Sequence, residues 1–289
     1  MIDPFIAQIR GRYQEGRLIP FVGAGVSSGV TWEIDGQHKR GPSWREVVDE
    51  ACRILEFEIP DLLRTRGTDL QILEYFHLKQ TGYGELTAWL QRELAAPDEA
   101  LLASRVHQAL ANLSNCRIYY TTNYDDFLER ALHLHGRPSK RSAGEPDIGD
   151  AIVAESTGTS PSGSCEVVKF HGDLFNPSQM VISESNYEHR LALNTSLDHR
   201  LRSDLLGRAL LFIGYSFRDP NVAYLFRRLK EESGPLPGTA YGHRAYIAVA
   251  DPSDFEYLLF RERNIQVIPI NATDQTEQTA ELLEAIANG

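Results

Sequence analysis

The stretch that decides the fold is residues 18–27, which read LIPFVGAGVS. Leu18–Val22 is a short apolar run without polar alternation, which is typical of a strand buried on both faces of a parallel sheet. Glycines directly after such a strand let backbone N–H groups approach a phosphate, and the Ser27 hydroxyl offers one more hydrogen bond. Position 28 is Ser, so this is not the dinucleotide motif G-x-G-x-x-G, and the Lys of a Walker loop is missing. The segment alone predicts either a phosphate-binding loop or a simple tight turn.

Further apolar runs follow the same pattern and alternate with helical periodicity. The expected strands are Leu18–Val22, Arg117–Thr121, Glu166–Phe170, Ala209–Ile213, Ala245–Val249 and Ile265–Ile268. About six such strands separated by helices predict an α/β fold with a Rossmann-like, doubly wound parallel sheet. Residues 136–164 are rich in Gly, Ser, Pro and Asp, so we expect a long irregular loop there.

One long stretch without strand signals interrupts this alternation. Ser43 and Glu46 form a capping-box pattern, and helical periodicity continues from there to about residue 113. The clearest helices in this stretch are expected over Asp69–Lys79, Tyr83–Leu94 and Pro97–Leu110. We therefore predict a single domain over residues 1–289 with a helical insert at 43–113.

Polar and glycine-bearing segments follow four of the expected strands. In chain order they are residues 23–27, Thr121-Thr122-Asn123-Tyr124-Asp125, His171-Gly172 and Gly214-Tyr215-Ser216. Parallel sheets bind ligands at the carboxyl ends of their strands, near the topological switch point, so we expect these segments to converge on one crevice. Each has a simpler explanation when taken alone. Asn123 or Asp125 suits a helix N-cap, and a single histidine such as His171 is commonly a structural residue.

The residue types in these segments suit a nucleotide ligand. An Asn side chain offers a donor and an acceptor and an Asp accepts hydrogen bonds, so Asn123 and Asp125 suit a ribose and a carboxamide. A histidine at the end of a strand, such as His171, is placed to act as a general base near neutral pH. Gly214 and Ser216 suit a second phosphate or the adjoining ribose.

The composition narrows the classes of function. Lys and Arg number 29 and Asp and Glu number 40, so the formal net charge is −11, which argues against direct nucleic-acid binding by this chain. Cys52, Cys116 and Cys165 have no C-x-x-C spacing, so we expect no zinc ribbon, no other metal and reduced thiols in a cytoplasmic protein. The longest apolar run, around Ala209–Gly214, is far too short to span a membrane, and no signal peptide is visible.

Taken together and in order, the four segments resemble the sirtuin family. GAGVS at 23–27 is similar to the sirtuin phosphate loop GAGxS, TTNYD at 121–125 to the TQNxD segment, His171-Gly172 to the catalytic histidine segment, and GYS at 214–216 to the later GxS loop. The two C-x-x-C pairs that bind structural zinc in sirtuin deacylases are absent. GPSW at 41–44, KFHG at 169–172 and SFRDPN at 216–221 instead resemble the bacterial sirtuin-like NADases of antiphage defence.

This resemblance implies a sirtuin-like NAD-binding domain that cleaves NAD+ as its substrate, without a metal. The residues implied to bind NAD+ are Gly23, Ala24, Gly25, Ser27, Thr122, Gly214 and Ser216. Asn123 would hold a ribose hydroxyl or the attacking water, Asp125 would orient the nicotinamide end, and His171 would act as general base. With the zinc module absent, the helical insert would cover the pocket and water would be the acceptor, which gives nicotinamide and ADP-ribose or a cyclised form.

The resemblance also implies a regulated effector. A sirtuin-like subunit of this size resembles the one that acts with a HerA-type DNA-translocase ATPase, so we expect a homo-oligomer and a possible partner of that type. Two other functions remain open at this point. The chain would be either a non-catalytic subunit that binds NAD or ADP-ribose, or a zinc-free deacylase or ADP-ribosyltransferase.

Overall fold

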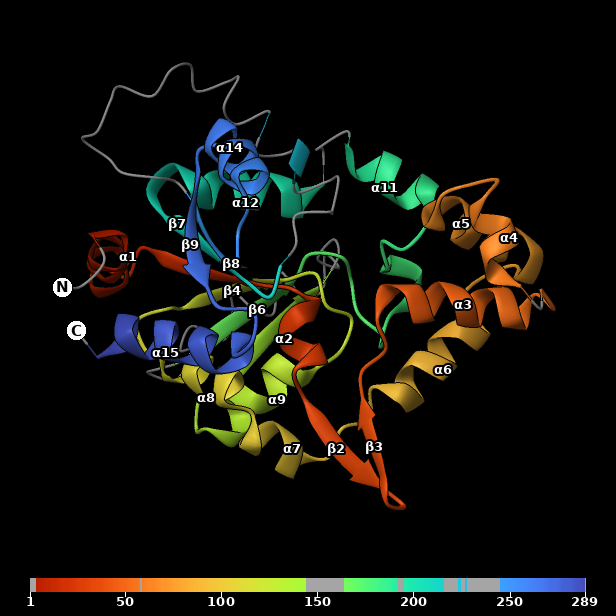
Figure 1. Ribbon diagram of the computed structural model, residues 1–289, viewed down its shortest axis with the longest axis horizontal. Helices are drawn as coiled ribbons and strands as arrows, with labels where there is room; N and C mark the ends of the chain where they lie inside the picture. Colours follow the sequence, from red (N-terminus) through yellow and green to blue (C-terminus); the bar gives the residue numbers. More distant parts are fainter. Residues whose placement is uncertain are drawn as a thin grey trace, which may run out of the picture.

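A seven-stranded parallel sheet forms the centre of the molecule (Figure 1). The computed structural model describes residues 4–57, 59–143, 164–191, 195–215, 223–224, 227 and 245–288. The strand order is β5-β6-β4-β1-β7-β8-β9, and every pair of neighbours is parallel. The strands are β1 (Leu18–Val22), β4 (Ile118–Thr121), β5 (Ser139–Ala143), β6 (Cys165–Lys169), β7 (Ala209–Ile213), β8 (Ala245–Ala250) and β9 (Ile265–Ile270). The predicted Rossmann-like α/β fold is therefore confirmed.

The seventh strand, β5, lies within the segment that we expected to be an irregular loop. That expectation was wrong for Ser139–Ala143, which pairs in parallel with β6 at the edge of the sheet. Its sequence, SKRSA, has no apolar run because an edge strand with half-exposed side chains needs none. Residues 144–163 of the expected loop lie outside the described residues.

Helices cover both faces of the sheet, as the continuous apolar strands predict (Figure 1). On one face, Leu18 and Val22 of β1 share a core with α1 (Pro4–Gln14), α8 (Arg105–Asn112), α9 (Phe127–Leu134) and α15 (Gln275–Ala287). On the other face, Ile19 and Phe21 pack with α12 (Ser196–Gly207) and α14 (Asp254–Glu262). Side chains that alternate along β1 thus belong to two separate hydrophobic cores.

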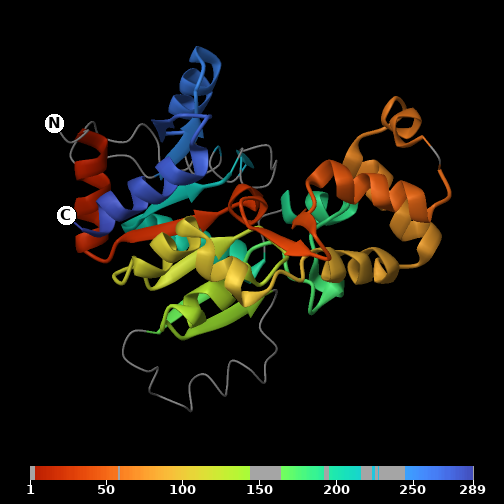
Figure 2. The ribbon, with the colours of Figure 1, turned by 60° about the horizontal axis from the view of Figure 1, so that its bottom comes forward.

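Four helices gather at the end of the molecule opposite α1 and α15 (Figures 1 and 2). They are α3 (Trp44–Ile54), α4 (Pro60–Arg64), α5 (Asp69–Gln80) and α6 (Gly84–Glu93), and α11 (Glu184–Leu191) packs against α5. Their core includes Leu174, Met180 and Ile182, which follow β6. We call α3–α6 the helical layer.

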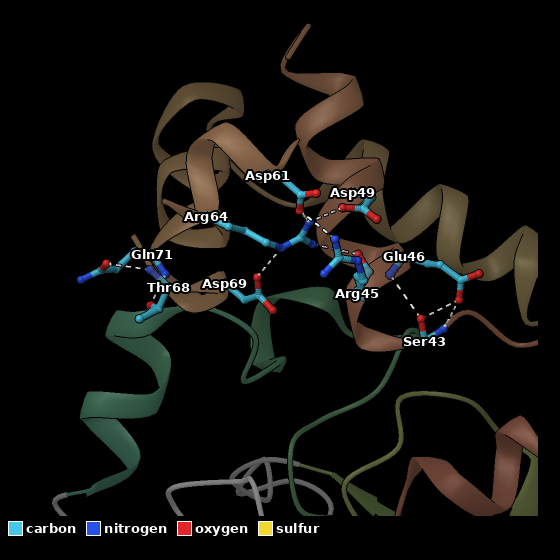
Figure 3. Close-up of polar contacts among 9 residues, drawn as sticks. All are labelled: Ser43, Arg45, Glu46, Asp49, Asp61, Arg64, Thr68, Asp69 and Gln71. Carbon is cyan, nitrogen blue, oxygen red and sulfur yellow. Dashed lines mark hydrogen bonds and ion pairs between the residues drawn. The ribbon is translucent and has the colours of Figure 1, made fainter. Parts of the chain in front are cut away.

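Arg64 ties three helices of the helical layer together (Figure 3). Its guanidinium contacts Asp49 at 2.6 Å, Asp69 at 3.0 Å and Asp61 at 3.2 Å. The capping box predicted at Ser43 is present at the start of α3, and a second one, at Thr68, begins α5. The ion pairs of Arg64 and the capping boxes at the starts of α3 and α5 therefore hold this layer together.

The rest of the 43–113 stretch packs differently from the helical layer. The single helix expected over Pro97–Leu110 is divided into α7 (Asp98–Ala103) and α8, because Ser104 is extended between them. Leu110 of α8 belongs to the core beneath the sheet. The division of the chain into one domain with an insert at 43–113 stays a prediction.

A hairpin that we did not predict joins the glycine segment to the helical layer. It follows the short helix α2 (Ala24–Ser28) and consists of β2 (Thr31–Ile34) and β3 (Gln37–Arg40). Asp35 and Gly36 form its turn with φ values of +52° and +74°, the left-handed pair that a two-residue hairpin turn requires. None of the helices in the described parts of the chain is long and apolar enough to cross a bilayer.

Candidate active site

A cleft of about 700 Å³ lies at the carboxyl ends of the strands. The four expected segments follow β6, β4, β1 and β7, which are consecutive neighbours in the sheet. The chain passes from β1 to β4 on one side and from β7 to β8 on the other, so the topological switch point, where such folds bind ligands, lies between β1 and β7. Residues of these segments that line the cleft are Ala24, Gly25, Ser27, Thr122, Asn123, Tyr124, Asp125, His171, Gly214 and Tyr215. The convergence expected from the sequence is therefore present.

Glycines let the segments after β1 and β7 cross in close contact. A Cβ at Gly25 would lie 2.9 Å from Gly214 Cα, and one at Gly23 would lie 2.5 Å from Gly214 O. Gly214 itself has a φ of +61°, and a Cβ there would lie 2.5 Å from the Val26 nitrogen. Gly23 and Gly214 thus pack backbone on backbone. At Gly23 the absence of a side chain serves this packing, whereas we had expected it to let a phosphate approach.

Asn123 lines the cleft, and its side chain is held by the glycine segment that follows β1. Its Nδ2 donates to Gly23 O at 3.1 Å and to Ser27 Oγ at 2.8 Å, and its backbone N–H donates to Thr121 Oγ1 at 3.0 Å. These bonds fix which end of the amide is nitrogen. The buried Oδ1 has no hydrogen-bond partner among the described residues. An acceptor without a partner is therefore built into the site.

His171 is buried at the end of β6 and is packed between two aromatic rings. Its ring lies against Phe170, with centroids 5.9 Å apart, and meets Tyr187 of α11 edge-on at 5.4 Å. Gly172 follows with a φ of +74°, and a Cβ there would lie 2.5 Å from Gln179 O. The glycine therefore permits the sharp turn that leaves His171 at the cleft.

Asp125 and Thr122 complete the segment after β4. Asp125 Oδ1 accepts a hydrogen bond from the Phe127 N–H at 3.1 Å, so the carboxylate supports the first turn of α9 while also lining the cleft. The N-cap of α9 is Asp126, so Asp125 lies one residue before the cap position that the sequence suggested for it. The Thr122 N–H donates to Val22 O at 3.3 Å and continues the pairing of β4 with β1.

Comparison with known proteins agrees with this geometry. The family model described as SIR2-like domain matches residues 117–268, which run from the start of β4 into β9. This chain belongs to the SIR2-like family. The matched range contains Asn123, His171 and Gly214, whereas the glycine segment after β1 precedes it.

Curated relatives of this SIR2-like chain are similar over most of its length. It is 28% identical to NAD(+) hydrolase ThsA of Acinetobacter baumannii (strain 532279) over 231 residues, which are 80% of this chain and 42% of the relative. It is 29% identical to NAD(+) hydrolase ThsA of Cytobacillus dafuensis over 210 residues, 73% of this chain and 37% of the relative. Defense-associated sirtuin 2 of Bacillus subtilis is 23% identical over 281 residues, 91% of this chain and 24% of the relative. The chain thus spans about two fifths of the ThsA proteins and less of the third.

Parts of the SIR2-like cleft were missed by the sequence analysis. The carboxyl end of β8 and its surroundings contribute Ala248, Val249, Ala250, Glu256, Phe260 and Gln275. Hydrogen bonds from the Ser253 backbone and side chain lower the pKa of Glu256, so this rim is negatively charged at neutral pH. The rule that ligands bind at the carboxyl ends of strands applies to β8 as well, and would have pointed to it.

The helical layer forms the opposite wall of the cleft. Trp44, Val47, Leu70, Leu90 and Leu94 line it from α3, α5, α6 and the end of α6. Ser216, expected to bind the ligand, lies outside the described residues, as does the helix expected after Asp219. Among the described residues there is no group of three or more His, Cys, Asp or Glu side chains that would hold a metal ion.

Proposed function

We propose that this chain hydrolyses NAD+ at the bond between nicotinamide and ribose. The observation that carries the proposal is the meeting of Asn123 and His171 in one cleft at the switch point of the sheet. A cleft of about 700 Å³ suits a ligand of dinucleotide size, since small-molecule sites measure roughly 300–1,000 Å³. The names of the ThsA relatives, NAD(+) hydrolase, support the same reaction.

In the proposed reaction, water replaces nicotinamide at C1′ of the ribose. The C1′–N bond breaks and its electron pair leaves with nicotinamide, while the water oxygen bonds to C1′ and gives up a proton. The products are nicotinamide, ADP-ribose and one proton. Asn123 Oδ1, which lacks a partner among the described residues, would accept a hydrogen from the water or a ribose hydroxyl. His171 would take the proton as general base.

The remaining residues would hold the substrate. Ala24, Gly25 and Ser27 would contact the pyrophosphate, with Gly214 and Ser216 near the adenosine half. Gly23 would act indirectly, because its carbonyl fixes the Asn123 amide. Thr122 and Asp125 would border the nicotinamide end. No step in this scheme requires a metal.

The direct test is product analysis. The purified chain is incubated with NAD+, and nicotinamide, ADP-ribose and cyclic ADP-ribose are separated by chromatography. We expect nicotinamide and ADP-ribose in equal amounts. If the chain binds NAD+ saturably but forms no product, either alone or with candidate partners, the result would favour a non-catalytic subunit that binds NAD or ADP-ribose. Loss of NAD+ only in the presence of an acyl-lysine peptide or an acceptor protein would favour a deacylase or a transferase.

We also propose a biological setting for this activity. The name Defense-associated sirtuin 2 supports a role in antiphage defence, where NAD+ depletion by this chain would be restrained by homo-oligomerisation or by a partner of the HerA-type ATPase class.

Cys52, Cys116 and Cys165 are free and buried, and burial raises the pKa of each thiol, which fits reduced structural thiols in the cytoplasm.

A further inference from the structure

A buried lysine connects the two strand ends that carry Asn123 and His171. Lys169 is the last residue of β6 and lies two residues before His171, and its side chain is 1% exposed. Its Nζ donates a hydrogen bond to the backbone carbonyl of Asp125, two residues after Asn123. The same Nζ lies 3.4 Å from Glu129 Oε1 on α9. One side chain thus links the strand that leads to His171 with the segment that follows Asn123.

Stability alone gives a weak reason for a charged residue at this position. Burying an ion pair costs about as much in desolvation as the pair returns, and apolar replacements of buried pairs are often neutral or stabilising. Burial raises the pKa of the Glu129 carboxyl, and the ammonium of Lys169 opposes that rise. The Lys169 ammonium donates a directed hydrogen bond to the Asp125 carbonyl, which an apolar side chain cannot do.

Other hydrogen bonds between the end of β4 with its following loop and the chain after β6 involve backbone atoms or a neutral side chain. The Phe170 N–H donates to Thr121 O at 2.7 Å, and the Leu174 N–H donates to Tyr124 O at 3.3 Å. Tyr124 Oη donates to Val181 O at 2.7 Å. The Lys169 bond is attached at Asp125, one residue beyond the Tyr124 bonds and past the end of β4. Removing it frees the carbonyl at the far end of the segment 122–126 without breaking the ladder.

We infer that Lys169 is a positioning residue, which fixes the backbone of residues 122–126 and so holds Asn123 in register with His171, while Glu129 holds the ammonium of Lys169. This inference rests on the proposed NAD+ hydrolysis for its kinetic consequence. Misplacing a catalytic group by about 1 Å costs on the order of 10²-fold in rate. We expect substrate binding at the glycine segment to change little, because the bonds of Lys169 go to Asp125 and Glu129 and not to residues 23–27.

The test compares Lys169→Met with Arg137→Met. Arg137 is the matched control because it also donates to backbone carbonyls, those of Ala111, Leu113 and Cys116, but near the amino end of β4. We expect Lys169→Met to lower kcat by about 10²-fold with KM within roughly threefold of the wild type. Arg137→Met loses thermal stability, and the kcat of its folded fraction stays unchanged. An equal fall in kcat for both variants would overturn the inference.

A double variant separates positioning from stability. Lys169→Met alone leaves Glu129 buried beside an apolar side chain, which destabilises the fold and reduces the yield of folded protein. Lys169→Met/Glu129→Gln removes both charges, so we expect much of the stability to return while kcat remains low. Recovery of kcat together with stability would mean that the pair is only structural.

Hydrogen exchange tests the positioning without any turnover. We expect the amides of residues 122–126 to exchange faster in Lys169→Met than in the wild type, while those of β4 stay protected. The inference fails if exchange in this segment is unchanged. If the segment loosens but the wild type never cleaves NAD+, the positioning stands and the proposed function is the part that fails.

Discussion

The two walls of the cleft differ in how firmly their side chains are held. On the sheet side, Asn123 and His171 are 8% and 3% exposed, and backbone bonds between neighbouring strands fix the segments that carry them. On the helical side, Trp44 is 37% exposed, and the other lining residues of α3 and α6 are apolar. The groups that we propose to act on the reacting bond lie on the sheet side, which we call the rigid wall, and we propose that the helical layer covers them. We therefore expect substitutions on the sheet side to lower kcat and substitutions on the helical side to weaken substrate binding.

The largest effect is expected from the rigid wall. His171→Ala should lower kcat for NAD+ cleavage by roughly 10²–10⁴-fold, because a positioned general base contributes that much. Asn123→Ala should lower it by roughly 10²-fold, because the acceptor that positions the water or the ribose hydroxyl is lost. Nicotinamide release measures the rate, and circular dichroism checks that the fold is intact. His38→Ala is the control, since this histidine lies on the β2–β3 hairpin with its side chain 85% exposed. NAD+ consumption near the wild-type rate by either site variant would contradict the assignment.

A second substitution breaks the rigid wall itself. Gly214→Ala places a Cβ in a left-handed backbone conformation, which costs about 1–2 kcal/mol, and presses it against the Val26 nitrogen. Gly136→Ala has a similar φ of +75° but meets nothing within 4 Å, so it isolates the backbone term. We expect the melting temperature of Gly214→Ala to fall further than that of Gly136→Ala, by roughly 2–4 °C for each additional kcal/mol. Equal melting temperatures would show that the crossing of the two segments is not tight.

A third substitution addresses the helical wall. Trp44→Ala removes apolar surface from the cleft, so we expect KM for NAD+ to rise by roughly 10-fold, about 1.4 kcal/mol, with little change in kcat. Phe57→Ala is the control, because Phe57 is also 37% exposed in the helical layer but does not line the cleft. A fall in kcat rather than a rise in KM would place Trp44 among the groups that act on the reacting bond.

Sequence reasoning worked best where one physical pattern had one structural meaning. The apolar runs Leu18–Val22 and Ala209–Ile213 are strands with the expected bounds, because both faces of a parallel sheet are buried. Once the strands were known, parallel geometry alone placed Asn123 and His171 at the same edge. The approximate position of the candidate site therefore followed from the sequence.

The sequence could not supply features that depend on contacts between distant residues. Glycine is needed both for a phosphate approach and for the packing of Gly23 against Gly214, and the residue type does not distinguish them. Lys169 at the end of an apolar run looks like an exposed lysine until Glu129 and Asp125 are found beside it, about 40 residues away in the chain. The polar edge strand β5 was missed because an edge does not require an apolar run.

The smallest effect is expected at the corner where the helical wall begins. Hydrogen bonds from Ser43 and the pairing with Arg40 lower the pKa of Glu46 to about 2, although burial opposes the shift. The folded pKa lies below the unfolded value, so this contribution to stability is present above about pH 4.5 and is lost as the pH falls toward 2. Glu46 is half exposed, and we expect less than about 1 kcal/mol.

Glu46→Gln isolates this contribution because glutamine keeps the capping-box bond and does not titrate. Urea unfolding of both proteins at pH 6 and pH 3, at matched ionic strength, measures the free energy of unfolding. Other carboxyl groups titrate equally in both proteins, so only the difference between them reports on Glu46. We expect the wild type to lose more stability than Glu46→Gln between the two pH values. Equal losses would mean that the charge of Glu46 contributes nothing and that the capping box holds α3 through its geometry alone. The position of Trp44 on the helical wall would then not depend on pH, like the backbone bonds of the rigid wall.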